Sequence, residues 1–276
     1  MNRTKSSLYL CVIGSALLTL TGIILRSVAV TLCFDKSTGY FEPSALSLVC
    51  QIISTLAVLF PTVTSILIPR QKLSAVWQGQ AISFAAILPG IALTAFAVYR
   101  LLVCGLYAET TALPYALSLF ALGAGVYFLL SPIFQTQKPR PVLHCTLGLF
   151  TVFWVLASVA DTYFDLFTTM NSPIKTIVQF GLLSAALMCL TELRFMLGKG
   201  LPRMGVCVHC LAMHFCLVAG ISALSAAIAD TGISTAYLMY GVVLLAIGLY
   251  ASIRLFVYVT ATASHVISPS QEDHAS

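Results

Sequence analysis

Charge is what this sequence has least of. Only 8% of the 276 residues are charged, against roughly a quarter in an ordinary soluble domain, whereas 59% are hydrophobic. A soluble core does not need this ratio, but a helix surrounded by hydrocarbon must be apolar on every side. The shortage of charge therefore excludes an ordinary soluble protein and predicts one that lies almost entirely in a lipid bilayer.

Motifs for catalysis and cofactor binding are also missing. The sequence contains no P-loop, GxSxG, HExxH or dinucleotide-binding motif, and its two hydrophilic ends are too short to fold as separate domains. We therefore predict no enzymatic activity and no cofactor. The net charge of +5 is explained by where the basic residues lie relative to the membrane, and it does not indicate a nucleic-acid partner.

Long apolar runs, separated by Pro, Gly and charged clusters, fill most of the chain. Each run approaches or exceeds the roughly 20 residues that cross about 30 Å of hydrocarbon. We predict an all-α, polytopic fold with one transmembrane domain over residues 1–276, of which residues 264–276 form a short disordered cytoplasmic tail. The eight predicted spans are residues 8–25, 44–68, 76–103, 113–134, 142–160, 173–197, 204–229 and 235–261.

Basic residues predict the orientation of these spans, because Lys and Arg resist translocation during insertion. With eight spans, all the basic pairs fall on one side, and the opposite loops are acidic or neutral. We therefore expect a cell-membrane protein with both termini in the cytoplasm. An alternative for the first span is a cleaved signal peptide, which would leave the remaining topology unchanged. The basic pairs are Arg3 with Lys5, Arg70 with Lys72, Lys138 with Arg140, and Lys199 with Arg203.

The second and sixth spans share an outline. Ser44 and Gln51 correspond to Ser172 and Gln179 at one constant offset, and both spans run in the same direction across the membrane. Two halves of four helices each would form a parallel repeat, an arrangement found among transporters. The alternative is a chance resemblance between apolar helices.

Polar residues gather where the fifth span turns into the sixth. Arg26 and Arg100 lie near the same ends of spans one and three, where they can reach lipid headgroups or the two carboxylates. One interpretation is a satisfied network that staples this hairpin to span one or three. The other is a water-facing vestibule whose carboxylates share a proton or bind a cation. The five polar residues of the hairpin are Asp161, Asp165, Asn171, Lys175 and Gln179.

A second set of charges lies near the cytoplasmic ends of spans six and eight. Glu192 and Arg254 lie close enough to that edge to pair across the two helices, while Arg194 extends to the headgroups. We expect a structural ion pair, and a gating pair is the alternative.

Span seven opens with Cys207, Cys210 and His214, which fall on one helical stripe. Thiolate and imidazole ligate Zn or Cu, but the spacing matches no standard zinc motif, so these residues are a weak metal candidate. The alternative is cysteine packing as a small hydrophobic residue. Further along, Ala219 and Ala223 begin a small-residue stripe that predicts close helix packing.

Three stretches carry a resemblance to known proteins. Asp161-Thr-Tyr-Phe-Asp165, then Asn171-Ser-Pro-Ile-Lys175, then Glu192-Leu-Arg194-Phe with Leu197-Gly198 resemble a pattern in uncharacterised multi-pass membrane proteins of clostridial bacteria. The resemblance covers the fifth and sixth spans, implies a bacterial cytoplasmic membrane, and implies no activity.

Three functional hypotheses follow from the residues. The first is a small-solute or ion transporter, because the loops are minimal and prolines interrupt spans two and three. The second is a membrane scaffold or partner subunit, which would contact lipid, other membrane subunits or a second copy of the chain. An intramembrane enzyme comes third. Water-accessible carboxylates joined to a central cavity would favour transport, and charge pairs sealed between helices would favour a scaffold.

Overall fold

The computed structural model describes residues 3–68, 80–107, 111–136, 141–165, 168–169 and 172–265. Within these ranges it contains eight helices, each long and apolar enough to cross a membrane. The predicted all-α polytopic fold is thereby confirmed. The helices are α1 Arg3–Leu32, α2 Ala45–Ile66, α3 Gln80–Tyr107, α4 Ala112–Thr136, α5 Pro141–Phe164, α6 Pro173–Met196, α7 Pro202–Ile228 and α8 Thr235–His265.

Several predicted boundaries differ from the observed ones. The first span was predicted to end at Leu25, but α1 continues through Arg26 to Leu32, because the arginine finds a partner on another helix and does not break the helix. Helix α8 extends two residues into the predicted tail, and the rest of that tail lies outside the described residues. The same holds for the predicted start of the third span at residues 76–79 and for the basic pairs at residues 70–72 and 138–140.

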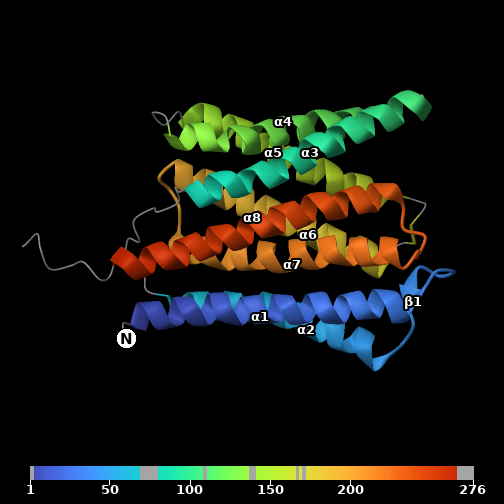
Figure 1. Cartoon of the computed structure of the whole chain (residues 1–276), viewed down its shortest axis with the longest axis horizontal. Helices are drawn as coiled ribbons and strands as arrows, with labels where there is room; N and C mark the ends of the chain where they lie inside the picture. Colours follow the sequence, from blue (N-terminus) through green and yellow to red (C-terminus); the bar gives the residue numbers. More distant parts are fainter. Residues whose placement is uncertain are drawn as a thin grey trace, which may run out of the picture.

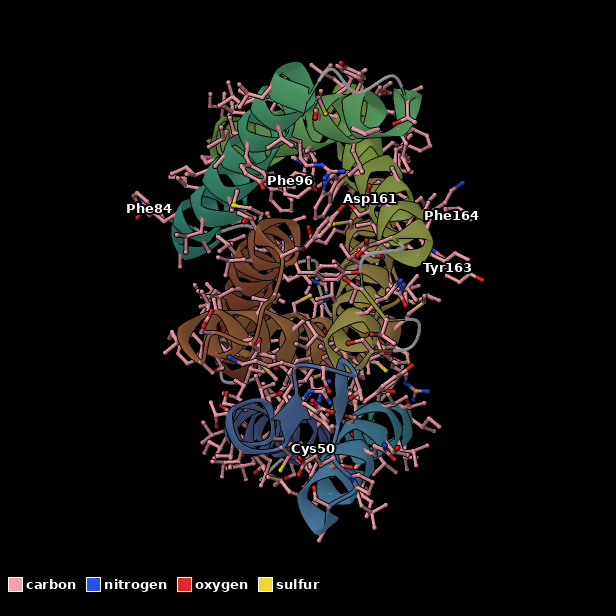
Figure 2. The ribbon with its side chains drawn as sticks, turned by 90° about the vertical axis from the view of Figure 1, so that its right-hand side faces the viewer. Cys50, Phe84, Phe96, Asp161, Tyr163 and Phe164 are labelled. Atoms are coloured by element: carbon pink, nitrogen blue, oxygen red, sulfur yellow. The ribbon has the colours of Figure 1, made fainter. Side chains whose placement is uncertain are left out.

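The helices form three layers (Figures 1 and 2). Helices α6, α7 and α8 make the central layer, α3, α4 and α5 cover one side, and α1 with α2 cover the other. The packing partners agree, since α1 and α2 contact α7 while α3 contacts α8. The layers do not show two equivalent four-helix halves, because α1 packs on α7 whereas α5, its counterpart in the predicted repeat, packs on α4 and α6.

Burial distinguishes the central layer from α2. In the most apolar part of each helix, 67% of α6 is buried, compared with 17% of α2. Large aromatic side chains fill the space between α8 and the layer of α3 to α5. Phe96 packs 4.9 Å from Tyr240 and 5.8 Å from Trp154, centroid to centroid. These contacts make α3 to α8 a densely packed unit, which we call the frame.

A two-stranded hairpin joins α1 to α2 and was not predicted. Strand β1 (Phe34–Asp35) pairs antiparallel with β2 (Tyr40–Phe41). Gly39, at φ +75°, supplies the left-handed conformation that the turn requires. The hairpin lies at the end of the bundle opposite to the start of α1 and the end of α8 (Figure 1). We call its end of the molecule the hairpin end and the other the terminal end.

Small residues let α7 and α8 approach closely, as the alanine stripe predicted. A Cβ added at Gly241 would lie 2.3 Å from the Cβ of Ala223, and one added at Gly220 would lie 2.8 Å from the backbone oxygen of Gly241. Because no side chain separates the two backbones at these glycines, α7 and α8 gain dispersion contacts along their interface.

Candidate functional site

Glu192 of α6 forms a polar cluster that is sealed among the central helices. The Nε of Arg254 in α8 donates to Glu192 Oε1 at 2.8 Å, and the Tyr250 hydroxyl lies 3.2 and 3.1 Å from the two carboxylate oxygens. Glu192 is 1% exposed and Arg254 is 4% exposed. The structure therefore brings together the two residues predicted to pair. Arg194 stays exposed nearby.

His209 of α7 joins this cluster through both of its ring nitrogens. Its Nδ1 lies 2.7 Å from the carbonyl oxygen of Gly205, and its Nε2 lies 3.2 Å from Glu192 Oε1. Both of these oxygens are acceptors when the carboxylate is ionised. The imidazole bridges the α7 backbone and the Glu192 carboxylate. The hydrogen bonds of this cluster join α6, α7 and α8 at the terminal end.

Asp161 forms the second charged cluster, near the hairpin end. Arg100 Nη2 donates to Asp161 Oδ1 at 2.9 Å, and the Tyr240 hydroxyl donates to Oδ2 at 2.8 Å. Asp161 lies toward the interior of the bundle, whereas Tyr163 and Phe164 point outward (Figure 2). The carboxylate thus joins α3, α5 and α8. This geometry matches the interpretation of a network that staples the fifth-to-sixth hairpin to span three.

Lys175 and Asp165 contact partners other than each other's charged groups. The Lys175 ammonium donates to the backbone oxygens of Tyr163 at 3.3 Å and Asp165 at 3.0 Å, which places a cation at the C-terminal end of α5. The Asp165 carboxylate accepts from the Thr168 hydroxyl at 2.6 Å. The polar line predicted along the start of α6 therefore stabilises the chain reversal.

Gln179 and Asn171 are the two remaining residues of the predicted polar line. Gln179 donates to the Thr162 hydroxyl at 3.4 Å, a contact between α6 and α5. Asn171 lies outside the described residues. The contacts above bind Asp161 to partners on neighbouring helices. The interpretation of this corner as a water-facing vestibule stays a prediction.

The weak metal candidate is not assembled in the described part of the chain. Cys210 forms a hydrogen bond with Cys11 of α1, whereas His214 packs on Gly22, where an added Cβ would lie 2.8 Å from the histidine Cε1. Among the described residues, no three His, Cys, Asp or Glu side chains are placed to hold a metal ion. The Cys207 thiol lies 3.8 Å from the Thr62 hydroxyl of α2.

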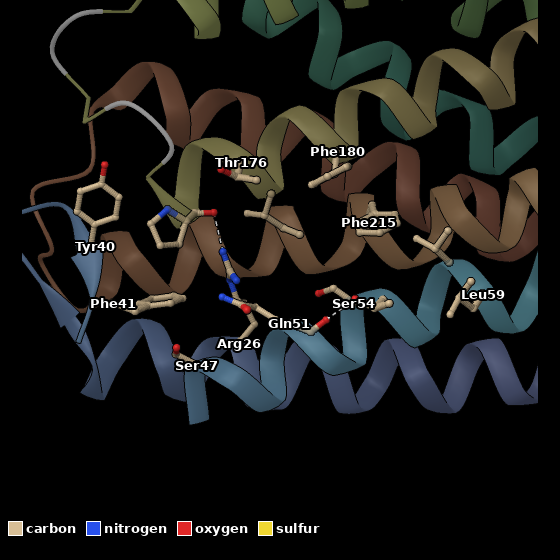
Figure 3. Close-up of a pocket in the computed structure, with 14 residues that line it drawn as sticks. Arg26, Tyr40, Phe41, Ser47, Gln51, Ser54, Leu59, Thr176, Phe180 and Phe215 are labelled. Atoms are coloured by element: carbon tan, nitrogen blue, oxygen red, sulfur yellow. Dashed lines mark hydrogen bonds between the residues drawn. The ribbon is translucent and has the colours of Figure 1, made fainter. Parts of the chain in front are cut away.

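A groove of about 640 Å³ lies on the other side of the molecule, between α2 and α6. Arg26, the hairpin residues Tyr40 and Phe41, and Phe215 of α7 complete its walls (Figure 3). Its lining residues Leu59 of α2 and Phe180 of α6 are 53% and 50% exposed, so the groove is open at the outer surface of the bundle between these two helices. We call it the Arg26 groove.

Arg26 stands at the hairpin end of the groove. Its Nη2 donates to the backbone oxygen of Pro173 at 2.6 Å, and its Cζ lies 4.8 Å from the centroid of the Phe41 ring (Figure 3). Its Nε has no hydrogen-bond partner among the described residues. No carboxylate of the described chain pairs with Arg26, in contrast to Arg100 and Arg254.

The lining of the groove changes from polar to apolar along its length. On α2 the sequence runs from Ser47 and Gln51 through Ser54 to Val58 and Leu59. On α6 it runs from Thr176 to Phe180, whose ring stacks on that of Phe215 with the centroids 5.5 Å apart. The hairpin end therefore offers hydrogen-bonding groups, and the middle of the bundle offers hydrocarbon and aromatic rings.

The β1–β2 hairpin holds the mouth of the groove. Asp35 accepts hydrogen bonds from the Ser37 backbone and hydroxyl and from the Thr38 hydroxyl, at 2.8 to 2.9 Å. These donors hold the pKa of the Asp35 carboxyl below its ordinary value of 3.8. The Thr169 hydroxyl donates to the Thr38 backbone oxygen at 2.9 Å, which ties the hairpin to the segment before α6.

From the sequence, Arg26 was predicted to reach either the lipid headgroups or the carboxylates of Asp161 and Asp165. The structure separates it from Asp161 and places it in the groove with α2 residues that were not singled out, except for Gln51. A signal was present in the sequence, because Ser47, Gln51, Ser54 and Thr55 give the first half of span two a hydroxyl- and amide-rich face. The partner helix of that face could not be read from the sequence.

The fold and these sites define a multi-pass α-helical membrane protein. Comparison with protein-family models, with curated proteins and with solved structures finds no match. The resemblance to clostridial membrane proteins therefore stays a prediction, and the function is argued from the geometry alone.

Proposed function

We propose that this chain is a membrane-embedded binding protein that receives its ligand sideways from the bilayer, in the Arg26 groove. The observation that carries the proposal is the groove itself, about 640 Å³ in volume, with a guanidinium at one end and stacked aromatic rings at the other. Ligand pockets commonly measure roughly 300–1,000 Å³ and combine a few placed polar groups with an apolar lining.

The two charged clusters support a static role for the rest of the protein. Glu192 and Asp161 each bind an arginine and a tyrosine on a neighbouring helix. Carboxylates that are bound in this way to neighbouring helices match the scaffold hypothesis better than an ion pathway through the carboxylates. The frame thus supplies a rigid wall, and α1 with α2 complete the binding site against it.

The predicted orientation indicates in which leaflet of the membrane the groove lies. If the basic pairs lie in the cytoplasm, the hairpin end faces outward. The mouth beside Arg26 then lies at the depth of the outer headgroups, and the apolar end lies near the middle of the bilayer. A ligand would enter from the outer leaflet of the cell membrane.

Filling the groove tests the proposal. Thr55 lies on the groove wall and is exposed, so Thr55→Trp blocks the site without entering the packed core. Leu156→Trp is the matched control, because Leu156 is 56% exposed and belongs to α5. Helix α5 lies in the layer on the other side of α6, α7 and α8 from α1 and α2 (Figure 1). Mass spectrometry of protein purified in mild detergent then measures the bound membrane molecules.

We expect the wild type and Leu156→Trp to retain a bound molecule that Thr55→Trp loses, and we expect all three proteins to melt at the same temperature once that molecule has been removed. Equal retention by Thr55→Trp would contradict a binding function for the groove. Loss of the molecule from both variants would do the same, because it would reflect lipid around the whole bundle.

A further inference from the structure

The geometry of the Arg26 groove points to a class of ligand, an inference that rests on the proposed binding function. We infer that the groove binds an anionic phospholipid-type amphiphile, with its phosphate at Arg26 and its acyl chain along Val58, Leu59 and Phe180. Charge, length and the absence of acidic lining residues each support this assignment.

The charge argument starts from the missing partner of Arg26. A guanidinium in a spanning helix is costly unless it is paired or reaches water or headgroups. Arg100 and Arg254 meet this requirement with carboxylates. Arg26 donates to the carbonyl oxygen of Pro173 and lies against the ring of Phe41, and no carboxylate among the described residues pairs with it. Its remaining N–H groups form a planar fork that matches the oxygens of a phosphate.

Gln51 adds a second donor next to this fork. It lies on the groove wall, one helical turn from Ser47. Its side-chain amide carries two N–H donors and is exposed on the groove side of α2 (Figure 3). A guanidinium, an amide and a hydroxyl thus converge on one end of the groove, where an anionic headgroup finds several donors.

The length of the groove matches half of a bilayer. Ser47 and Leu59 line its two ends on α2, and the twelve steps from one residue to the next between these positions rise about 18 Å at 1.5 Å per residue. Half of the hydrocarbon core measures about 15 Å. A lipid of the adjacent leaflet therefore enters in its ordinary orientation, with its head at the hairpin end and its chain on the Phe180–Phe215 stack.

The lining also argues against a zwitterionic headgroup. None of the groove residues that the structure describes is Asp or Glu, so a choline or ethanolamine ammonium finds no counter-charge there. The Phe41 ring, which could otherwise bind such a cation, already lies against Arg26. A small hydrophilic anion would leave the apolar half of the groove unused.

Competition between two lipids that differ only in headgroup tests the inference. Delipidated full-length protein in detergent is mixed with equal amounts of lysophosphatidylglycerol and lysophosphatidylcholine of one chain length, and native mass spectrometry measures the occupancy of each. The variants are Arg26→Gln, Arg26→Lys and Thr55→Trp. Arg194→Gln is the control, because Arg194 is exposed at the terminal end of α6.

We expect the wild type and Arg194→Gln to prefer the anionic lipid by roughly tenfold, a preference that Arg26→Lys reduces and Arg26→Gln abolishes. Thr55→Trp should lose both lipids. A wild type without preference, together with loss of both lipids in Thr55→Trp, would overturn the anionic assignment and leave the binding function standing. Unchanged binding by Thr55→Trp would overturn both.

Inorganic phosphate separates a lipid from a free anion as the source of the charge. We expect millimolar phosphate to leave the bound lysophosphatidylglycerol in place, because the acyl chain holds it in the apolar half. Complete displacement by phosphate would overturn the amphiphile and identify a simple anion site.

Discussion

Arg254 and Arg26 both lie in spanning helices, but the protein surrounds them differently. In the frame, Arg254 meets Glu192 at 2.8 Å and is 4% exposed. In the Arg26 groove, the guanidinium meets a backbone carbonyl and an aromatic ring, and no described carboxylate pairs with it. In the frame, the arginine charge holds neighbouring helices together. In the groove, the charge of Arg26 is left without a described carboxylate partner, as the proposed binding of an anionic ligand requires.

The largest effect is expected from Glu192→Ala. The substitution leaves Arg254 buried without its carboxylate, and breaking a buried pair in this way costs about 3–5 kcal/mol. Thermal unfolding in detergent should show a strong loss of stability. Glu42→Ala is the control, because Glu42 is exposed in the α1–α2 connection and should leave the melting temperature unchanged. A stable Glu192→Ala variant would contradict the structural role of the cluster.

A smaller loss is expected at the half-buried pair of Arg100 and Asp161, whose side chains are 13% and 21% exposed. Arg100→Gln should cost about 1.5–3 kcal/mol, since it removes a hydrogen bond between charged groups. The double variant Arg100→Gln with Asp161→Asn should be more stable than the sum of the single losses predicts. Simple additivity would show that the two residues act independently.

The interface of α7 and α8 tests whether close packing holds the frame. A Cβ at Gly220 would meet the Gly241 backbone oxygen at 2.8 Å, so Gly220→Ala should cost about 1–3 kcal/mol by overpacking. Gly105→Ala is the matched control, because nothing lies within 4 Å of a Cβ built there. Equal melting temperatures for the two variants would mean that the helices separate without cost.

The smallest effect is expected at the hairpin over the groove mouth. The pKa of Asp35 is lowered by hydrogen bonds from Ser37 and Thr38, so its contribution is present above pH 3.8 and is lost as the pH falls through the lowered pKa. The difference in melting temperature between wild type and Asp35→Asn should therefore shrink between pH 6 and pH 3. A difference that grows on acidification would contradict the assigned hydrogen bonds.

Much of the frame could be predicted from the sequence, because membrane insertion makes span length and charge position readable. Glu192 and Arg254 could be paired because both lie at a similar depth on helices six and eight. For Asp161 the sequence left two candidate partners, Arg26 and Arg100. Both lie at a similar depth in the membrane, and depth does not show which helices are neighbours. Tertiary packing decides that point, by placing α3 beside α8.

The groove could not be predicted for the same reason. Its walls come from α2 and α6, which the sequence separates by more than a hundred residues. Arg26 was expected to extend to the headgroups, and the first span was ended there. The structure instead continues α1 to Leu32 and adds a hairpin that holds Phe41 against the guanidinium. Local sequence shows that a polar face exists but not what it faces.

The central claim is that Arg26 serves a ligand while the arginines of the frame serve stability. The most direct measurement is the melting temperature of wild type and Arg26→Gln during titration with lysophosphatidylglycerol, because a ligand that binds only the folded state raises apparent stability by mass action. We predict that without lipid the two proteins differ in stability by about 1 kcal/mol or less, because the loss of the hydrogen bond from Arg26 to Pro173 is offset by the removal of a charge that no described carboxylate neutralises. Only the wild type should be stabilised as lipid is added. An Arg26→Gln protein that is strongly destabilised without lipid, or stabilised by it as much as the wild type, would contradict the claim.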